Sequence, residues 1–173
     1  GRACYDESGQ PIFSFSLEEL YNVLPFDNTI TTMFLSGREV QELFDFVAAR
    51  SAERGCNSQA QISGATVTLV CREDEHGAEP HADDIAIGGI ALNLNGTYEL
   101  AANNYIAGGG SGFEVLKRNT TQRDTFIPMR EAVQEYMERA GVVPCDDSDS
   151  KVGACAGDLR KAGLADGRIR MRY

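Results

Sequence analysis

The strongest constraint on the fold is an amphipathic helix predicted over residues 37–54. Ser36 and Glu39 have the spacing of a capping box at its start, and Gly55 directly follows its end. Apolar residues recur along it at helical spacing: Val40, Leu43, Phe44, Val47 and Ala48. Because these residues form one stripe, the helix must bury that side against another element, and the stripe is interpreted as core.

The segments around this helix predict strands and further helices. Strands are expected at residues 11–16, 29–36, 62–63, 65–70, 85–87, 90–94, 97–102 and 168–173, and helices at 17–24 and 128–140. Asn95-Gly96 is typical of a type I′ hairpin turn. Residues 72–84 and 114–125 are interpreted as polar connections. Because the elements interleave without regular βαβ spacing, the sequence predicts an α+β fold, with a mixed or antiparallel sheet and packed helices.

The length and charge of the chain limit the classes of protein to which it can belong. We expect residues 1–173 to form a single domain with one core. The opening GRACYD reads as structure, so we expect the chain to be part of a longer parent. No apolar run approaches the roughly 20 residues of a membrane-spanning helix. The net charge is −10 and the basic residues are scattered, which argues against nucleic acid as a partner.

Cysteines favour an oxidising compartment, either the periplasm or the outside of the cell. Cys56 and Cys71 flank strand signals and could form a disulfide across a hairpin, while Cys145 and Cys155 bracket a polar loop that a disulfide could close. Cys4 would then be left for a partner elsewhere in the parent. No CxxC spacing occurs, and both histidines lie in one polar segment, so a zinc site is not expected. A reactive thiol is the alternative interpretation.

A glycine-rich segment, NNYIAGGGSGF, spans Asn103 to Phe113. Four of the five positions from Gly108 to Gly112 are glycine. Glycine permits positive φ and lets another group approach the backbone closely. Taken alone, the segment fits an ordinary surface loop as well as a ligand site, and Phe26 fits a core aromatic.

Motifs of catalysis are missing from the sequence. It contains no GxSxG, no Walker loop, no HExxH and no Asp/His set of a two-metal phosphatase. Asp146, Asp147 and Asp149 lack the rest of an EF-hand and are interpreted as a solvated loop. We therefore expect the chain to act by binding.

Two long segments carry a family resemblance. LEELYNVLPFDNTITTMFLSGREVQELFDF and TYELAANNYIAGGGSGFEVL closely resemble the C-terminal domain of the secreted 5′-nucleotidases, a group that includes bacterial UDP-sugar hydrolases. The resemblance covers residues 1–140 and the final strand, whereas residues 141–166 match nothing recognisable. It implies that the chain is the substrate-recognition half of a hydrolase. Two divalent metal ions would then lie in an N-terminal metallophosphatase domain, and no cofactor in this chain.

The resemblance also implies how a base would be held. Phe26 and Tyr105 would sandwich it, and Asn28 would hydrogen-bond its edge. Gly55 would lie against it through the backbone, and Arg2 would reach the ribose or phosphate side. Aromatic stacking is worth about 1–3 kcal/mol per base, and an Asn amide offers both a donor and an acceptor.

One departure from the family lies in the glycine-rich segment. Gly109 and Gly110 would leave room for the sugar, and Ser111 stands where the family usually has an Asp that bonds the ribose hydroxyls. A neutral hydroxyl lacks the charge-assisted acceptor of a carboxylate. The replacement predicts weaker ribose binding, or a ligand other than an ordinary ribonucleotide.

Two hypotheses follow from the sequence. In the first, the chain recognises a nucleoside or nucleotide for a secreted, metal-dependent hydrolase, with the N-terminal domain as its partner. In the second, it is a non-catalytic binding or adhesion module on the same scaffold, with a diverged pocket. Phe26, Asn28 and Tyr105 together favour the first.

Overall fold

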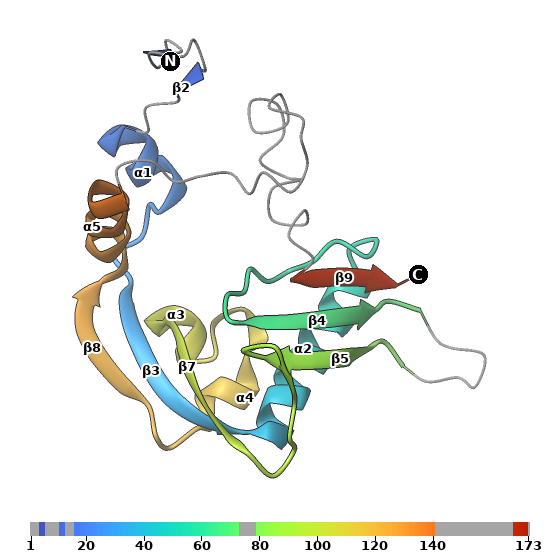
Figure 1. The fold of residues 1–173 in the computed structure, drawn as a ribbon. Coiled ribbons are helices and arrows are strands. Elements are labelled where there is room, and N and C mark those ends of the chain that lie inside the picture. Colours follow the sequence, from blue (N-terminus) through green and yellow to red (C-terminus); the bar gives the residue numbers. More distant parts are fainter. Residues whose placement is uncertain (1–3, 6–10, 13–15, 73–78, 141–167, 173) are drawn as a thin grey trace.

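The computed structural model describes residues 4–5, 11–12, 16–72, 79–140 and 168–172, and it confirms the α+β class (Figure 1). The helices are α1 Leu17–Val23, α2 Gly37–Ala52, α3 Asn104–Ala107, α4 Glu114–Lys117 and α5 Met129–Ala140, with a 3₁₀ turn at Gly110–Gly112. The strands are β1 Cys4–Tyr5, β2 Pro11–Ile12, β3 Thr29–Ser36, β4 Ala65–Val70, β5 His81–Ile87, β6 Ile90–Ala91, β7 Thr97–Asn103, β8 Arg123–Pro128 and β9 Ile169–Arg172.

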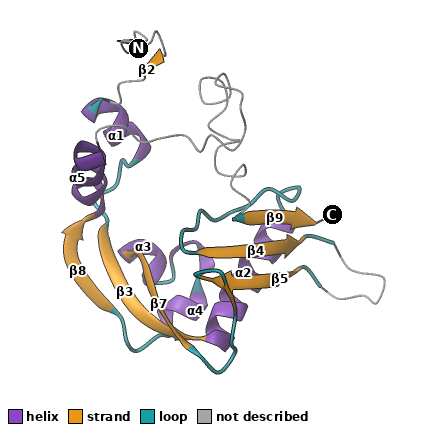
Figure 2. Cartoon of the chain, viewed as in Figure 1, coloured by secondary structure: helices purple, strands orange, loops and turns teal. Residues whose placement is uncertain are grey.

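Helix α2 is the predicted amphipathic helix. At its start the Ser36 hydroxyl accepts the Glu39 N–H at 3.3 Å, and the Glu39 carboxylate accepts the Ser36 N–H at 2.8 Å, which confirms the capping box. Val40, Phe44 and Val47 are buried, as the stripe predicts. Figure 2 shows α2 lying along β4 and β5, the two strands that it contacts most.

The strands form separate sheets in the described part of the chain. β3 lies between β7 and β8 in an antiparallel three-stranded sheet. A four-stranded sheet has the order β6-β5-β4-β9, with β9 parallel to β4. Their side chains share one core cluster, which contains Met33 and Leu35 of β3, Leu69 of β4 and Ile169 of β9. The expected closing strand is therefore confirmed at the edge of the second sheet.

The hairpin predicted at Asn95-Gly96 is wrong. The chain turns there, but β6 pairs with β5 while β7 pairs with β3, so the turn joins two different sheets. The Gly37 N–H donates to the Gly96 carbonyl at 2.9 Å. Local turn chemistry thus predicted the turn correctly and the pairing of its flanking strands wrongly.

Other differences concern element boundaries. β5 begins at His81, inside the segment expected to be a polar connection, and buries Ala82 and Ile85 on one side. The sequence did not predict this strand, because only one of its faces is buried and its other face carries polar residues. Residues 62–63 and 92–94 are not in strands, and residues 114–125 contain α4 and the first residues of β8 instead of a connection.

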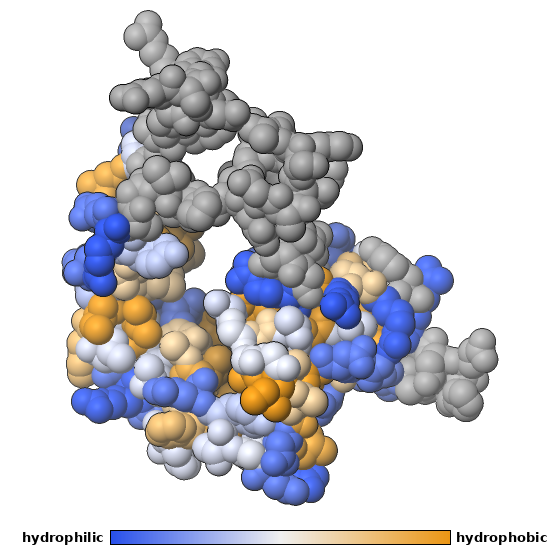
Figure 3. All heavy atoms as spheres, in the orientation of Figure 1, coloured by the Kyte–Doolittle hydropathy of each residue, from blue (hydrophilic) through white to orange (hydrophobic). Residues whose placement is uncertain are grey.

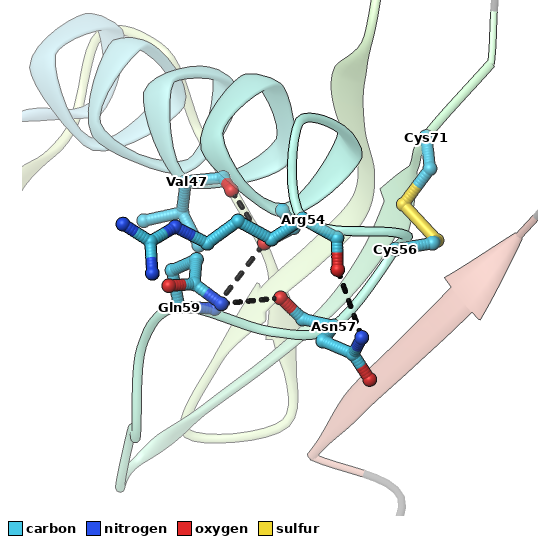
Figure 4. The surroundings of a disulfide bond; sticks show 7 residues. Val47, Arg54, Cys56, Asn57, Gln59 and Cys71 are labelled. Carbon is cyan, nitrogen blue, oxygen red and sulfur yellow. Dashed lines mark hydrogen bonds between the residues drawn. A yellow bond between two sulfur atoms is a disulfide. The ribbon is translucent and has the colours of Figure 1, made fainter.

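Cys56 and Cys71 form a disulfide, which confirms the predicted pairing (Figure 4). The bond does not cross a hairpin: it ties the loop after α2 to the end of β4. Cys145 and Cys155 lie outside the described residues. Among the helices that are described, none is long and apolar enough to cross a membrane.

Candidate functional site

A cavity of about 320 Å³ lies where the end of α2 faces the glycine-rich segment. Its lining residues are Arg50, Arg54, Gln59, Tyr105, Ile106, Ser111 and Phe113. The structure therefore places Tyr105 and Ser111, both predicted site residues, on one cavity. It adds polar side chains from α2 and from the loop after it, which no sequence motif indicates.

The glycine-rich segment is folded tightly around Tyr105. The Asn103 side-chain oxygen accepts the Ile106 N–H at 2.8 Å and caps α3. A Cβ atom on Gly110 would lie 2.5 Å from both a ring carbon and the carbonyl oxygen of Tyr105. Gly109 has φ of 89°, a left-handed conformation that favours glycine. Contact with Tyr105 thus explains Gly110, while the expected roles of Gly109 and Gly110 beside a sugar stay predictions.

Both predicted stacking aromatics are exposed, Tyr105 by 57% and Phe26 by 71%. The alternative interpretation of Phe26 as a core aromatic is therefore wrong. Figure 3 shows apolar residues at the surface on the side of the molecule formed by α1, α5 and β8. The exposed apolar residues of those elements and of the loop after α1 are Leu17, Tyr21, Val23, Phe26, Phe126, Ile127 and Tyr136.

Arg130 of α5 holds the turn that carries Phe26, a role that no sequence motif indicates. Its guanidinium donates to the Leu24 carbonyl at 2.9 Å, to the Phe26 carbonyl at 3.3 Å and to the Asp27 carboxylate at 3.0 Å. The same group lies 4.0 Å from the ring centroid of Tyr21. The exposed Phe26 side chain therefore projects from a backbone turn that is fixed by several hydrogen bonds.

The segments of Phe26 and Tyr105 approach each other at one end of the three-stranded sheet. Ile30 is paired with Asn103, and the Thr29 N–H donates to the Asn104 side chain at 3.3 Å. The backbone carbonyl of Asn28 accepts the Met129 N–H at 2.8 Å. Neither Phe26 nor Asn28 lines the cavity, so the aromatic sandwich stays a prediction.

Arg50 links the helix to the glycine-rich segment. Its guanidinium donates to the carbonyl oxygen of Ser111, whose φ of 57° is left-handed. It also lies 5.6 Å from the ring centroid of Phe46, which packs edge-on against Phe113 with 4.9 Å between centroids. Arg50 and Ser111 therefore form one continuous wall of the cavity.

The remaining predicted site residues are placed as follows. Gly55 has φ of 69°, is exposed and sits between Arg54 and the disulfide cysteine, so its backbone is next to the cavity wall without lining it. Arg2 lies outside the described residues, as do His76 and the aspartates near residue 147. A contact of Gly55 or Arg2 with a base or sugar stays a prediction.

Metal-ligating side chains do not cluster in the described ranges of the chain, where no group of three or more His, Cys, Asp or Glu residues could hold a metal ion. Hydrogen bonds from the Ser16 backbone and side chain lower the pKa of Glu19, and the hydrogen bond to Glu42 raises the pKa of Arg118. None of these residues lines the cavity.

Comparison with curated proteins finds similar nucleotide hydrolases. The chain is 27% identical over 128 residues to the trifunctional nucleotide phosphoesterase protein YfkN of Bacillus subtilis, covering 73% of this chain and 9% of that protein. It is 27% identical over 122 residues to a 5′-nucleotidase of Vibrio vulnificus, covering 70% of this chain and 20% of that enzyme. The chain thus spans a fifth or less of the length of these relatives.

Comparison with solved structures agrees with the sequence matches. The 5′-nucleotidase precursor of Thermus thermophilus superposes with a TM-score of 0.68 at 27% identity, covering 94% of this chain and 28% of that one. The family described as 5′-nucleotidase, C-terminal domain, matches residues 5–118. The match covers well over half of the chain, and the predicted resemblance is confirmed: this protein belongs to the 5′-nucleotidase C-terminal domain family.

Proposed function

We propose that this chain is the nucleoside-recognition part of a 5′-nucleotidase-type phosphoester hydrolase. It forms a single domain over residues 1–173 and binds the base of its ligand against Tyr105. The observation that carries the proposal is the exposed Tyr105 ring on a cavity of about 320 Å³. An aromatic ring that faces solvent at the wall of a cavity can stack on a flat base.

Phe26 and Asn28 complete the base site in this proposal. Phe26 projects from the turn held by Arg130, and ligand binding brings its ring to the second face of the base. The side-chain amide of Asn28 makes no hydrogen bond to the described residues, so its donor and acceptor are available for the edge of a base. Gly55 and Arg2 keep their expected roles next to the base and on the phosphate side.

Catalysis is assigned to another domain of the parent. Two divalent metal ions there would activate the attacking water and stabilise the phosphoryl oxygens. This chain would orient the nucleoside so that the phosphate points toward those ions. Its disulfide suits the periplasm or the extracellular space. We expect pure chain to release no phosphate from a nucleotide at any divalent metal concentration.

Calorimetry of this chain with adenosine, AMP and a UDP-sugar tests the proposal. At least one ligand should bind, and Tyr105→Ala should weaken its binding by about 1–3 kcal/mol because the stacking face is lost. Tyr136→Ala, which removes an exposed tyrosine from α5 away from the cavity, is the matched control. Binding of none of the three ligands, or equal binding by the Tyr105 variant, would overturn the proposal.

A non-catalytic binding or adhesion module is the second candidate function. Two observations favour it: Ser111 replaces the acidic residue usual in the family, and Phe26 does not line the cavity. This candidate predicts that titrating nucleosides and nucleotides into the protein gives no heat of binding. These ligands should also leave its melting temperature unchanged. The same titrations therefore decide between the two functions.

A further inference from the structure

The cavity next to Tyr105 is cationic in a protein that is strongly acidic. Arg50 and Arg54 both line it, and no Asp or Glu is among its lining residues. The whole chain, in contrast, has a net charge of −10. Two guanidinium groups in one concave wall create a local positive potential that favours a negatively charged ligand group.

Arg54 is available to bind such a group. Its backbone is fixed, because its N–H donates to the Ser51 carbonyl at 3.1 Å and its carbonyl accepts the Asn57 side chain at 2.8 Å. Its guanidinium has no hydrogen bond or ion pair with the part of the chain that the structure describes. Figure 4 shows the Arg54 side chain extending past Gln59 and away from the disulfide.

The loop that carries this wall is held in place from its other side. Cys56 is buried and bonded to Cys71, and the Gln59 N–H donates to the buried Ser51 hydroxyl at 3.3 Å. That hydroxyl in turn donates to the Val47 carbonyl at 2.6 Å. A guanidinium on a fixed loop loses less conformational entropy when it binds than one on a mobile loop.

Arg50 supplies the second cation beside Ser111. An arginine has several N–H donors, and among the described residues only the Ser111 carbonyl accepts a hydrogen bond from this one. The remaining donors can bind a further acceptor in the same cavity. Planar guanidinium groups bind phosphate oxygens with paired hydrogen bonds, so two of them form a fitting phosphate site.

We propose that Arg50 and Arg54 bind a phosphate carried on the sugar of the ligand, at its 3′ position, separate from the phosphate that is presented for hydrolysis. The inference rests on the proposed function, because it places the base against Tyr105 in the same wall. The expected ribose contact of Ser111 would then place Arg50, which is hydrogen-bonded to the Ser111 carbonyl, on the side of the sugar hydroxyls. The preferred ligand is then a nucleotide with a second phosphate on its ribose.

Calorimetry with adenosine, adenosine 5′-monophosphate and adenosine 3′,5′-bisphosphate tests this site. At low salt the bisphosphate should bind about tenfold more tightly than the monophosphate, as expected for hydrogen bonds to a charged group. The advantage should shrink as ionic strength rises, because salt screens the charges. The readout is the ratio of the two affinities, because a variant that only loosens the cavity weakens the binding of both ligands to the same extent.

Variants test whether Arg50 and Arg54 cause the tighter binding of the bisphosphate. Arg54→Gln and Arg50→Gln should each lower the affinity ratio toward one. Arg139→Gln, which removes an exposed arginine of α5 paired with Glu135, should leave the ratio unchanged. Equal binding of the two nucleotides, or a ratio that both cavity variants retain, would overturn this inference and leave the proposed function standing. Binding of none of the three ligands would overturn the proposed function as well.

Discussion

At the scale of single residues, Gly110 shows that the glycine-rich segment is shaped first by its own tyrosine. A surface loop and a ligand site were both expected explanations for so many glycines, yet the space that a Gly110 side chain would need is already taken by the ring and carbonyl of Tyr105. The glycine thus lets the ring lie over the backbone with one side supported. A supported ring is a better stacking surface than one that rotates freely.

We predict that Gly110→Ala displaces Tyr105 and destabilises the fold by about 1–3 kcal/mol, the usual result of overpacking. The clash involves a backbone oxygen as well as the ring, so a rotamer change of Tyr105 cannot relieve it. Urea unfolding measures the loss of stability. Gly108→Ala is the control, because Gly108 has φ of −74° and its nearest contact would be at 3.3 Å. Equal stability of the two variants would contradict the prediction.

The sequence revealed those site residues that lie in a segment of unusual composition. Tyr105 and Ser111 were found because glycines surround them, and both line the cavity. Arg50, Arg54 and Arg130 were missed because each lies on or just after a helix, where a charged residue normally indicates a solvated face. Only the tertiary structure shows that the polar side of α2 meets the glycine-rich segment.

At the scale of elements, the direct junction of β3 and α2 determines where the cavity wall stands. Ser36 is both the last residue of β3 and the N-cap of α2, with no loop between them. The direction of the helix therefore follows from the strand and from the capping hydrogen bonds. Arg50, in the last turns of α2, is placed at the cavity by that junction.

We predict that Ser36→Ala lowers the free energy of unfolding by about 1 kcal/mol, because the Glu39 N–H loses its acceptor. Ser16→Ala removes the same kind of cap from the shorter helix α1, where Ser16 is exposed. It should have the smaller effect on global unfolding, since a short exposed helix can fray locally. Chemical denaturation monitored by circular dichroism compares the two, and a larger loss for Ser16→Ala would contradict this view.

At the scale of the whole molecule, one shared core joins the two larger sheets, which strand pairing leaves separate. The core cluster draws on both larger sheets, and α2 contacts strands of each. The α+β class and α2 were predictable because periodicity reports which side of an element is buried. The pairing of β7 with β3 and of β9 with β4 was not, because each depends on residues far apart in sequence.

We predict that the double change Cys56→Ser and Cys71→Ser lowers the free energy of unfolding by about 3 kcal/mol, as expected for a closed loop of this size. Urea unfolding with and without a reductant measures it. The double variant serves as its own control, because any reductant effect that it retains must come from the other cysteines. A wild-type protein that is indifferent to reductant would contradict the prediction.

The parallel pairing of β9 with β4 has a consequence for the order of events during synthesis. β4 can pair with β5 soon after both leave the ribosome, since only residues 71–80 separate them. In the described part of the chain, the opposite edge of β4 pairs with residues 169–172, which follow β4 by about a hundred residues. Pairs so distant form slowly. The disulfide, which closes a short loop at the end of β4, can therefore form before that edge is covered.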